Sequence, residues 1–221
     1  MSNNFMGKSL YLWGIAVSIV LVLGGGLAVS QQTQELPEDN YARGLILLKQ
    51  NKLQEAKQCF DLVITQNPNH KEAYYYRGVC LIKLNLVDEA MIDFDRSLAI
   101  DPNFPLGMVG RAQVFIKRVD YPTATQEIER ALLIDPLNAE AFYQKGIIFG
   151  YQKNTPAAIE SFNKCLEIDP NHAYAHYQIG LAYYQVKRPD LTIVHFDRFI
   201  ALAPEAPEAE QVRNLLNAIR K

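Results

Sequence analysis

The chain has 221 residues and a formal net charge of −2, with 49% apolar and 21% charged residues. This length fits one or two ordinary domains or one array of small repeats, and the composition is that of a folded protein. The near-neutral balance argues against a nucleic-acid partner, because phosphate binding requires a surplus of lysine and arginine.

The first thirty residues predict a membrane segment. No charged residue lies between Lys8 and Glu35, and the stretch 10–30 is long enough for one helix to cross a bilayer. We favour a transmembrane anchor over residues 1–30, with a linker over 31–36. A cleaved signal peptide is the alternative, since a shorter apolar core followed by small residues is typical of one.

The charges that flank this segment predict its orientation. Lys8 lies on the N-terminal side, and the other flank is acidic until Arg43. Positive charge stays in the cytoplasm, so we expect the body of the protein on the extracytoplasmic side, which is the periplasm in a bacterium. The three cysteines, which form no C-x-x-C, suit a reducing compartment and point the other way. We expect Cys59, Cys80 and Cys165 to be buried, not paired in disulfides or bound to zinc.

A 34-residue repeat follows the membrane segment. The dipeptide Asp-Pro recurs at this spacing, and five prolines keep the period without a gap: Pro68, Pro102, Pro136, Pro170 and Pro204. A fixed period of this length indicates stacked supersecondary units. The five units are 37–70, 71–104, 105–138, 139–172 and 173–206.

Each unit is expected to hold two helices. The second helix carries Ala and Phe four residues apart, as in Ala90 and Phe94, and this spacing places both on one helix face. The turns between the helices fall near Asn51 and Asn85, because asparagine tolerates the left-handed conformation of a helix end. Proline ends each unit, since it cannot continue a helix.

The recurring residues resemble the tetratricopeptide repeat family, whose pattern occupies positions 4, 8, 11, 20, 24, 27 and 32 of each unit. The unit 139–172 supplies Phe142, Gly146, Phe149, Ala158, Phe162, Cys165 and Pro170. The unit 71–104 supplies Tyr74, Gly78, Leu81, Ala90, Phe94, Ser97 and Pro102. The resemblance implies an all-α, right-handed solenoid of five helix-turn-helix units.

Two units depart from this pattern. The unit 105–138 has Ala112 for glycine and Ile128 for the aromatic residue, and the last unit has Thr192 for alanine and Phe199 for a small residue. These departures predict locally altered packing. Residues 207–221 predict a C-terminal capping helix, because Val212, Leu215, Leu216 and Ile219 form one apolar stripe.

The resemblance also implies a binding surface. First helices of such repeats line a concave groove, and positions 2, 5, 9, 12 and 13 point into it. Position 9 is aliphatic in four of the five units, so we expect an apolar groove with tyrosines at its edge. The candidate partner-binding residues are Tyr41, Leu45, Leu48, Lys49, Tyr75, Val79, Ile82, Lys83, Gln113, Ile116, Lys117, Tyr143, Ile147, Tyr177, Leu181 and Tyr184.

Such a groove favours an amphipathic helix or an apolar peptide segment as its ligand. Chaperone-binding members of the family grip a C-terminal carboxylate with Lys and Asn at positions 5 and 9 of an early unit. Here those positions hold Tyr41, Leu45, Tyr75 and Val79, so we reject a clamp of that kind. We further expect Tyr75→Ala with Val79→Ser to abolish partner capture and leave the fold unchanged.

No enzyme is indicated. The sequence has no H-E-x-x-H and no phosphate-binding loop, and it predicts no cofactor and no catalytic or metal-ligating residue. His172 and His176 are four residues apart, but the first lies in a turn and the second at a packing position. The sequence therefore favours a membrane-tethered scaffold that serves the assembly or maintenance of a membrane or envelope complex. A self-assembling homo-oligomer and an exported periplasmic accessory of an envelope enzyme or secretion machine are the alternatives.

Overall fold

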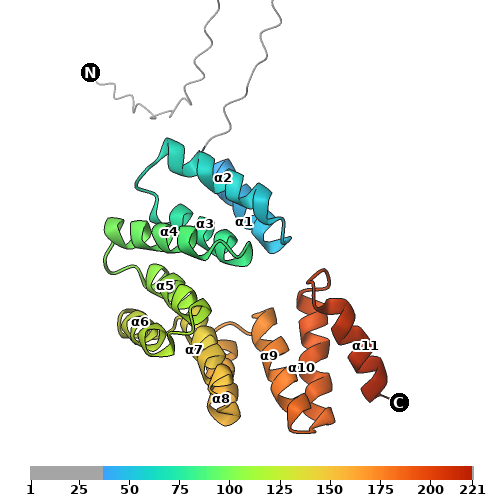
Figure 1. Cartoon of the computed structure of the whole chain (residues 1–221). Coiled ribbons are helices and arrows are strands. Elements are labelled where there is room, and N and C mark those ends of the chain that lie inside the picture. Colours follow the sequence, from blue (N-terminus) through green and yellow to red (C-terminus); the bar gives the residue numbers. More distant parts are fainter. Residues whose placement is uncertain (1–36, 221) are drawn as a thin grey trace, which may run out of the picture. The chain divides into compact units, whose positions relative to one another are not determined.

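A computed structural model describes residues 37–220, and within that range every regular element is an α-helix (Figure 1). The expected all-helical, solenoid-like fold is confirmed. First helices begin 34 residues apart, and so do second helices. The helices are α1 (Pro37–Lys49), α2 (Leu53–Gln66), α3 (Lys71–Lys83), α4 (Val87–Ile100), α5 (Pro105–Lys117), α6 (Tyr121–Ile134), α7 (Ala139–Tyr151), α8 (Thr155–Ile168), α9 (Ala173–Gln185), α10 (Pro189–Leu202) and α11 (Ala209–Ile219).

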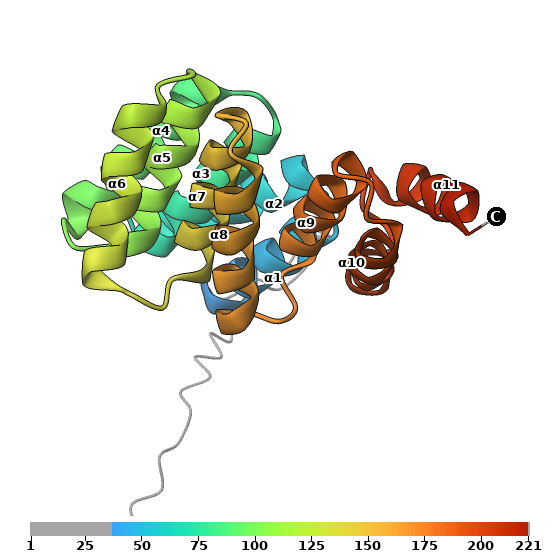
Figure 2. The same cartoon turned by 90° about the horizontal axis from the view of Figure 1, so that it is seen from below.

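Each helix packs against its neighbours in sequence, and the first helices of the first four units also contact one another. These contacts join α1 to α3, α3 to α5 and α5 to α7. Figures 1 and 2 show this row of first helices, with α4 and α6 lying beside it. One surface of the stack is therefore built mainly from first helices.

The turn within each unit depends on one residue with a left-handed backbone. Asn51 and Asn85 have φ angles of 58° and 63°, as their sequence predicts. The same position in the next units holds Val119, Lys153 and Lys187, with φ angles of 64°, 60° and 58°. The turn is therefore set by the spacing of the two helices, and side chains poorly suited to this conformation are forced into it.

A glycine and a phenylalanine hold the two helices of most units together. A Cβ atom on Gly78 would lie 2.6 Å from Cε1 of Phe94, and one on Gly146 would lie 2.5 Å from Cε1 of Phe162. The rings therefore pack directly on the backbone of the first helix, which explains the absence of a side chain there.

The unit 105–138 solves the same packing problem with different residues. Ala112 and Ile128 replace the glycine and the phenylalanine, and both are fully buried. Because isoleucine is smaller than phenylalanine, it leaves room for the extra methyl group of alanine. The larger residue on the first helix is therefore offset by the smaller residue on the second, so the total side-chain volume is nearly kept.

The last unit is closed by α11. Val212 and Leu216 are 2% and 4% exposed, and they form one apolar cluster with Phe196 and Phe199. Leu215 packs against the same cluster. Thr192 is also fully buried, and its hydroxyl donates a hydrogen bond to the carbonyl of Arg188 at 2.9 Å. A polar residue at this alanine position therefore carries no unsatisfied donor.

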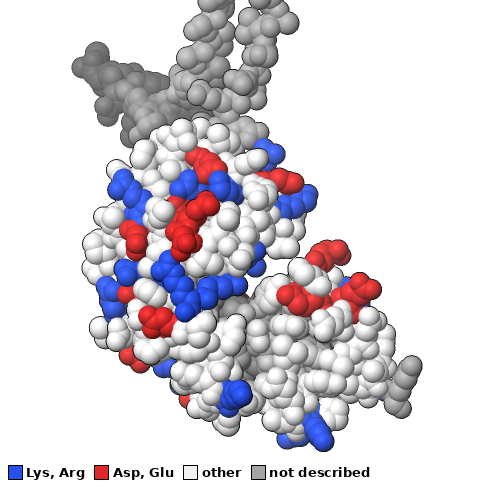
Figure 3. Space-filling model, in the orientation of Figure 1, with Lys and Arg blue, Asp and Glu red and all other residues white. Residues whose placement is uncertain are grey.

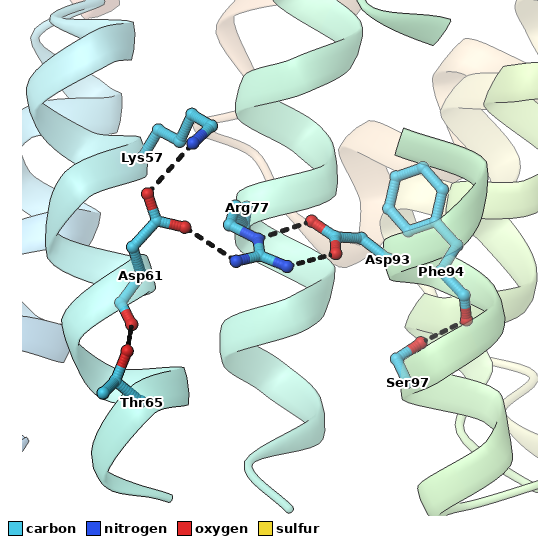
Figure 4. Close-up of polar contacts among 7 residues, drawn as sticks. All are labelled: Lys57, Asp61, Thr65, Arg77, Asp93, Phe94 and Ser97. Carbon is cyan, nitrogen blue, oxygen red and sulfur yellow. Dashed lines mark hydrogen bonds and ion pairs between the residues drawn. The ribbon is translucent and has the colours of Figure 1, made fainter. Parts of the chain in front are cut away.

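An arginine on the first helix of one unit links the second helices of two neighbouring units. Arg77 on α3 donates hydrogen bonds to Asp61 on α2 and to Asp93 on α4, and Lys57 pairs with Asp61 at 3.0 Å (Figure 4). Ser97 donates to the carbonyl of Phe94 at 2.7 Å in the same region.

The structure tests the expectation for the cysteines but does not reach the predicted membrane segment. The three cysteines are buried, as expected. The predicted anchor at 1–30 and the linker at 31–36 lie outside the described residues. Among the helices that the structure does describe, none has both the length and the apolar content needed to span a bilayer.

Candidate functional site: the concave groove

A groove of about 510 Å³ runs along the row of first helices. We call this surface the groove throughout. Its walls come from α3, α5 and α7, the start of α9, and the segment before α11. The lining residues are Tyr75, Tyr76, Val79, Ile82, Lys83, Gln113, Ile116, Lys117, Glu140, Tyr143, Gln144, Ile147, Tyr151, His172, Tyr174 and Glu208.

Tyrosines form much of the groove wall, and they are fixed by other rings. The ring of Tyr75 contacts that of Tyr76 at a centroid distance of 5.0 Å, and it meets Phe104 edge-on. Tyr143 lies 4.6 Å from the imidazole of His172. Burial raises the pKa of Tyr75 and of Tyr143, so both remain neutral at physiological pH. These rings offer a rigid, preformed surface to a ligand.

Glu140, at the start of α7, places a carboxylate in this aromatic surface. Its Oε1 accepts hydrogen bonds from Nε2 of Gln113 at 3.1 Å and from Nε2 of Gln144 at 2.7 Å. Its Oε2 lies 3.3 Å from Nε2 of His172. Burial alone would raise the pKa of Glu140, but the hydrogen bond and the electrostatic attraction from His172, with the hydrogen bonds from Gln144 and Gln113, outweigh burial and lower this pKa. The carboxylate is therefore charged at neutral pH.

The capping role of His172 sets which of its nitrogens faces Glu140. Nδ1 of His172 accepts the backbone N–H of Ala175 at 3.1 Å and so caps α9. Nε2 therefore carries a proton and donates a hydrogen bond to Oε2 of Glu140. The imidazole of His172 is thus fixed at both nitrogens, by the first turn of α9 at Nδ1 and by Glu140 at Nε2.

A chain of contacts crosses the groove. Nζ of Lys83 on α3 lies 5.5 Å from the ring centroid of Tyr174 on α9. The hydroxyl of Tyr174 donates to Oε2 of Glu208 at 3.1 Å. Burial and the charge of Glu208 raise the pKa of Tyr174 to about 12. This chain brings the second unit into contact with the fifth.

Charges lie on both sides of the groove. Figure 3 shows basic side chains over α5 and acidic side chains at the α10–α11 connection, with a hollow in the surface between them. That connection and the start of α11 contain Glu205, Glu208 and Glu210. A second hollow, of about 600 Å³, lies between α7 and α9 and shares Ile147 and Tyr151 with the groove.

The structure gathers nine of the sixteen predicted residues in the groove. They are Tyr75, Val79, Ile82, Lys83, Gln113, Ile116, Lys117, Tyr143 and Ile147.

The others lie elsewhere. Tyr41, Leu45 and Leu48 pack against the core of the first unit, and Tyr177 packs on Phe196 and Phe199. Leu181 lines the second hollow, and Tyr184 is 47% exposed on α9. Lys49 is exposed at the end of α1.

Several lining residues escaped the sequence prediction. Glu140 and Tyr174 occupy position 2 of their units, a position the family resemblance already marks as pointing into the groove, and Glu208 lies in the segment before α11. Tyr76 and Gln144 share position 6, which no pattern in the sequence marked. His172 ends its unit, and only the fold brings it to the groove.

One predicted variant needs correction. Tyr75 is 5% exposed and belongs to an apolar cluster with Phe94 and Phe104. The expectation that Tyr75→Ala would leave the fold unchanged is wrong, because truncation of a buried ring removes core packing. Only the edge of Tyr75 lines the groove, so less buried residues are better probes of binding.

Comparisons with known proteins agree with the fold. Two family models, both described as tetratricopeptide repeat, match residues 41–105 and 139–172. These matches support the tetratricopeptide repeat family, whose members generally mediate protein–protein interaction. No curated protein matches the chain significantly.

Several solved structures match the chain. The tetratricopeptide repeat protein TTC0263 of Thermus thermophilus has 16% identity and a TM-score of 0.69, and the match covers 84% of this chain and 99% of that one. YrrB, described as having an unusual peptide-binding site, has 21% identity and a TM-score of 0.47, with 82% and 94% covered. MamA 41-end of Desulfovibrio magneticus RS-1 has 20% identity and a TM-score of 0.48, with 77% and 97% covered. At these identities the likeness to TTC0263 concerns the fold alone.

Proposed function

We propose that this protein is a membrane-tethered interaction scaffold that binds a segment of a partner protein in the groove. The observation that carries the proposal is the groove along the first helices, in which nine of the sixteen lining residues are tyrosine or aliphatic. An open surface of this kind suits an amphipathic helix or an apolar peptide segment. The proposal gives the protein no catalytic role.

The tether in this proposal is the apolar segment 1–30, and its support is the sequence alone. The acidic flank before Arg43 supports an extracytoplasmic body. Deletion of residues 1–30 should move the protein from the alkaline-washed membrane fraction to the soluble fraction. Retention of the truncated protein in membranes would contradict the tether without bearing on the groove.

Site-specific photocrosslinking tests the groove. A benzoylphenylalanine at Tyr151, which is 61% exposed and lines the groove, should crosslink the full-length protein to its partner. The same probe at Leu133, which is 85% exposed on α6 and outside the groove, is the matched control. We expect an adduct from position 151 and none from position 133.

A second pair of variants distinguishes the groove from the rest of the surface. Ile82→Asp places a charge in the groove and should remove the adduct. Ile92→Asp, at a site on α4 that is 67% exposed, should not change it. An adduct that survives Ile82→Asp, or forms equally from position 133, would rule out the groove as the binding surface. An adduct with the mass of two copies of this chain would show that the groove binds a second copy, and would favour a self-assembling scaffold over an adaptor.

A further inference from the structure

The carboxylate of Glu140 has no lysine or arginine partner among the described residues. Gln113, Gln144 and His172 donate hydrogen bonds to it, and none of the lysines and arginines that the structure describes forms an ion pair with it. Its side chain is only 28% exposed. The hydrogen bonds keep the carboxylate charged, so it presents to the groove a negative charge that no described lysine or arginine neutralises.

The carboxylate also has an unused acceptor position. Two carboxylate oxygens offer about four lone-pair sites. Oε1 uses two of them for Gln113 and Gln144, whereas Oε2 uses one for His172. Oε2 can therefore accept one more hydrogen bond, and Glu140 lines the open groove, from which a donor can approach.

The rings around Glu140 suit a cation. Its negative charge helps to raise the pKa of Tyr75, Tyr76 and Tyr143, which shows that the three rings lie within its field. Tyrosine faces attract cations, and the attraction is stronger at a site that excludes water. A carboxylate with tyrosine rings beside it therefore combines two features that favour the same ligand chemistry.

A similar contact already exists inside the groove. The ammonium of Lys83 lies over Tyr174, whose hydroxyl donates to the carboxylate of Glu208. There, a cation, a tyrosine ring and a glutamate are assembled entirely from this chain. At Glu140, the ring and the carboxylate are present and the cation is absent among the described residues.

We propose that the groove selects a partner segment bearing an arginine or lysine side chain, whose cation pairs with Oε2 of Glu140 beside the tyrosine rings. This inference rests on the proposed function, because it names the chemistry of the segment that the groove binds. Arginine is the better fit of the two, since its planar guanidinium both stacks on rings and donates to a carboxylate. The apolar residues Val79, Ile82 and Ile147 receive the side chains that flank the cation.

Peptide selection provides the test. Random peptides of about 12 residues, displayed on phage, are selected on the immobilised full-length protein in mild detergent. Selected sequences are synthesised with a fluorescent label, and their affinities are measured by anisotropy. We expect the selected peptides to share an arginine or lysine within an apolar segment.

Three changes assign the cation to Glu140. Replacement of the shared arginine by neutral citrulline should weaken binding about tenfold or more, and Glu140→Gln should have the same effect. The two changes together should weaken binding no further than either alone. Glu72→Gln is the matched control, because Glu72 holds the same position of its unit but does not line the groove. It should leave affinity unchanged.

The outcomes separate this inference from the proposed function. Peptides that lose affinity with Ile82→Asp but tolerate both citrulline and Glu140→Gln would overturn the cation site and leave the groove as the binding surface. Absence of any peptide sensitive to Ile82→Asp would overturn both. Should Glu140→Gln impair folding, as judged by its melting curve, the citrulline peptide still decides the question on the unmodified protein.

Discussion

Arg77 and Asp93 form a bidentate ion pair between the first and second helices of one unit. Nε of Arg77 donates to Oδ2 of Asp93 at 2.7 Å, and Nη2 donates to Oδ1 at 2.6 Å. Asp93 is 4% exposed, whereas Asp61, the other carboxylate on Arg77, is 36% exposed. The hydrogen bonds to Asp93 keep the pKa of Arg77 above its usual high range. The two carboxylates share one guanidinium, but only one of them is buried.

Because Asp93 is buried and Asp61 is more exposed, replacing each by asparagine should lower the free energy of unfolding by different amounts. Asp93→Asn should lower the free energy of unfolding by about 2–3 kcal/mol, because it leaves Arg77 without its buried counter-charge. Asp61→Asn should cost less than about 1 kcal/mol, as is usual for an exposed pair. Urea denaturation followed by circular dichroism measures both. Equal losses would show that burial does not decide the strength of these contacts.

The compensated exchange of volume in the third unit predicts a transferable pair of substitutions. Gly146→Ala should destabilise the protein by about 1–3 kcal/mol, because the new methyl group meets the ring of Phe162. Adding Phe162→Ile reproduces the Ala112 and Ile128 pair and should recover at least half of that loss. A double-mutant cycle measures the coupling, and additive losses would contradict the proposed compensation.

The left-handed residue in the turn of the third unit predicts a stabilising change. Val119 has a φ of 64° and is 67% exposed, so its branched side chain pays a backbone cost with little packing in return. Val119→Asn should raise the free energy of unfolding by about 0.5–1 kcal/mol. The converse change at the same position of the preceding unit, Asn85→Val, should lower it by a similar amount. Thermal melting of the two variants checks both signs.

Two histidines predict acid sensitivity in the last unit. Nδ1 of His176 lies 3.1 Å from Nδ1 of His195, and Nε2 of His176 faces the carbonyl of Pro170. Burial and the charge of His176 lower the pKa of His195 to about 4, and burial followed by nearby Arg198 and His172 lowers that of His176. The Pro170 carbonyl partly offsets the second shift.

The sign follows from the difference between folded and unfolded states. Between pH 6.5 and 4 the unfolded chain binds more protons at His195 than the folded protein does, so stability falls as the pH decreases. We expect a loss on the order of 1–2 kcal/mol by pH 4, after allowance for partial exposure. His195→Phe should flatten this part of the stability profile. An unchanged slope in the variant would assign the acid sensitivity to other groups.

The sequence predicted the fold well because the repeat is a local property. The glycines, alanines and prolines of each unit determine which faces meet within and between adjacent helices, and these contacts span few residues. Turn residues were recognised at Asn51 and Asn85, where the side chain suits the backbone. They were missed at Val119, Lys153 and Lys187, where helix spacing overrides side-chain preference.

The groove was harder to predict, because its extent depends on how successive units rotate. Tyr41 and Tyr177 hold the same position as Tyr75 and Tyr143, yet they pack against cores at the two ends of the stack. Glu140 sits at a helix start, where an acidic residue has an ordinary explanation in the helix dipole. Gln144 lies one helical turn away on the same helix, whereas Gln113 and His172 come from other segments, and only the tertiary structure brings those two to the carboxylate.

The contact between Lys83 and Tyr174 has a mechanical consequence. A stack of repeats behaves as a spring, because small rotations between neighbours add up along its length. Lys83 and Tyr174 join the second unit to the fifth across the groove. Any rotation between units that widens the groove therefore has to separate Lys83 from Tyr174 and loses this cation–π contact.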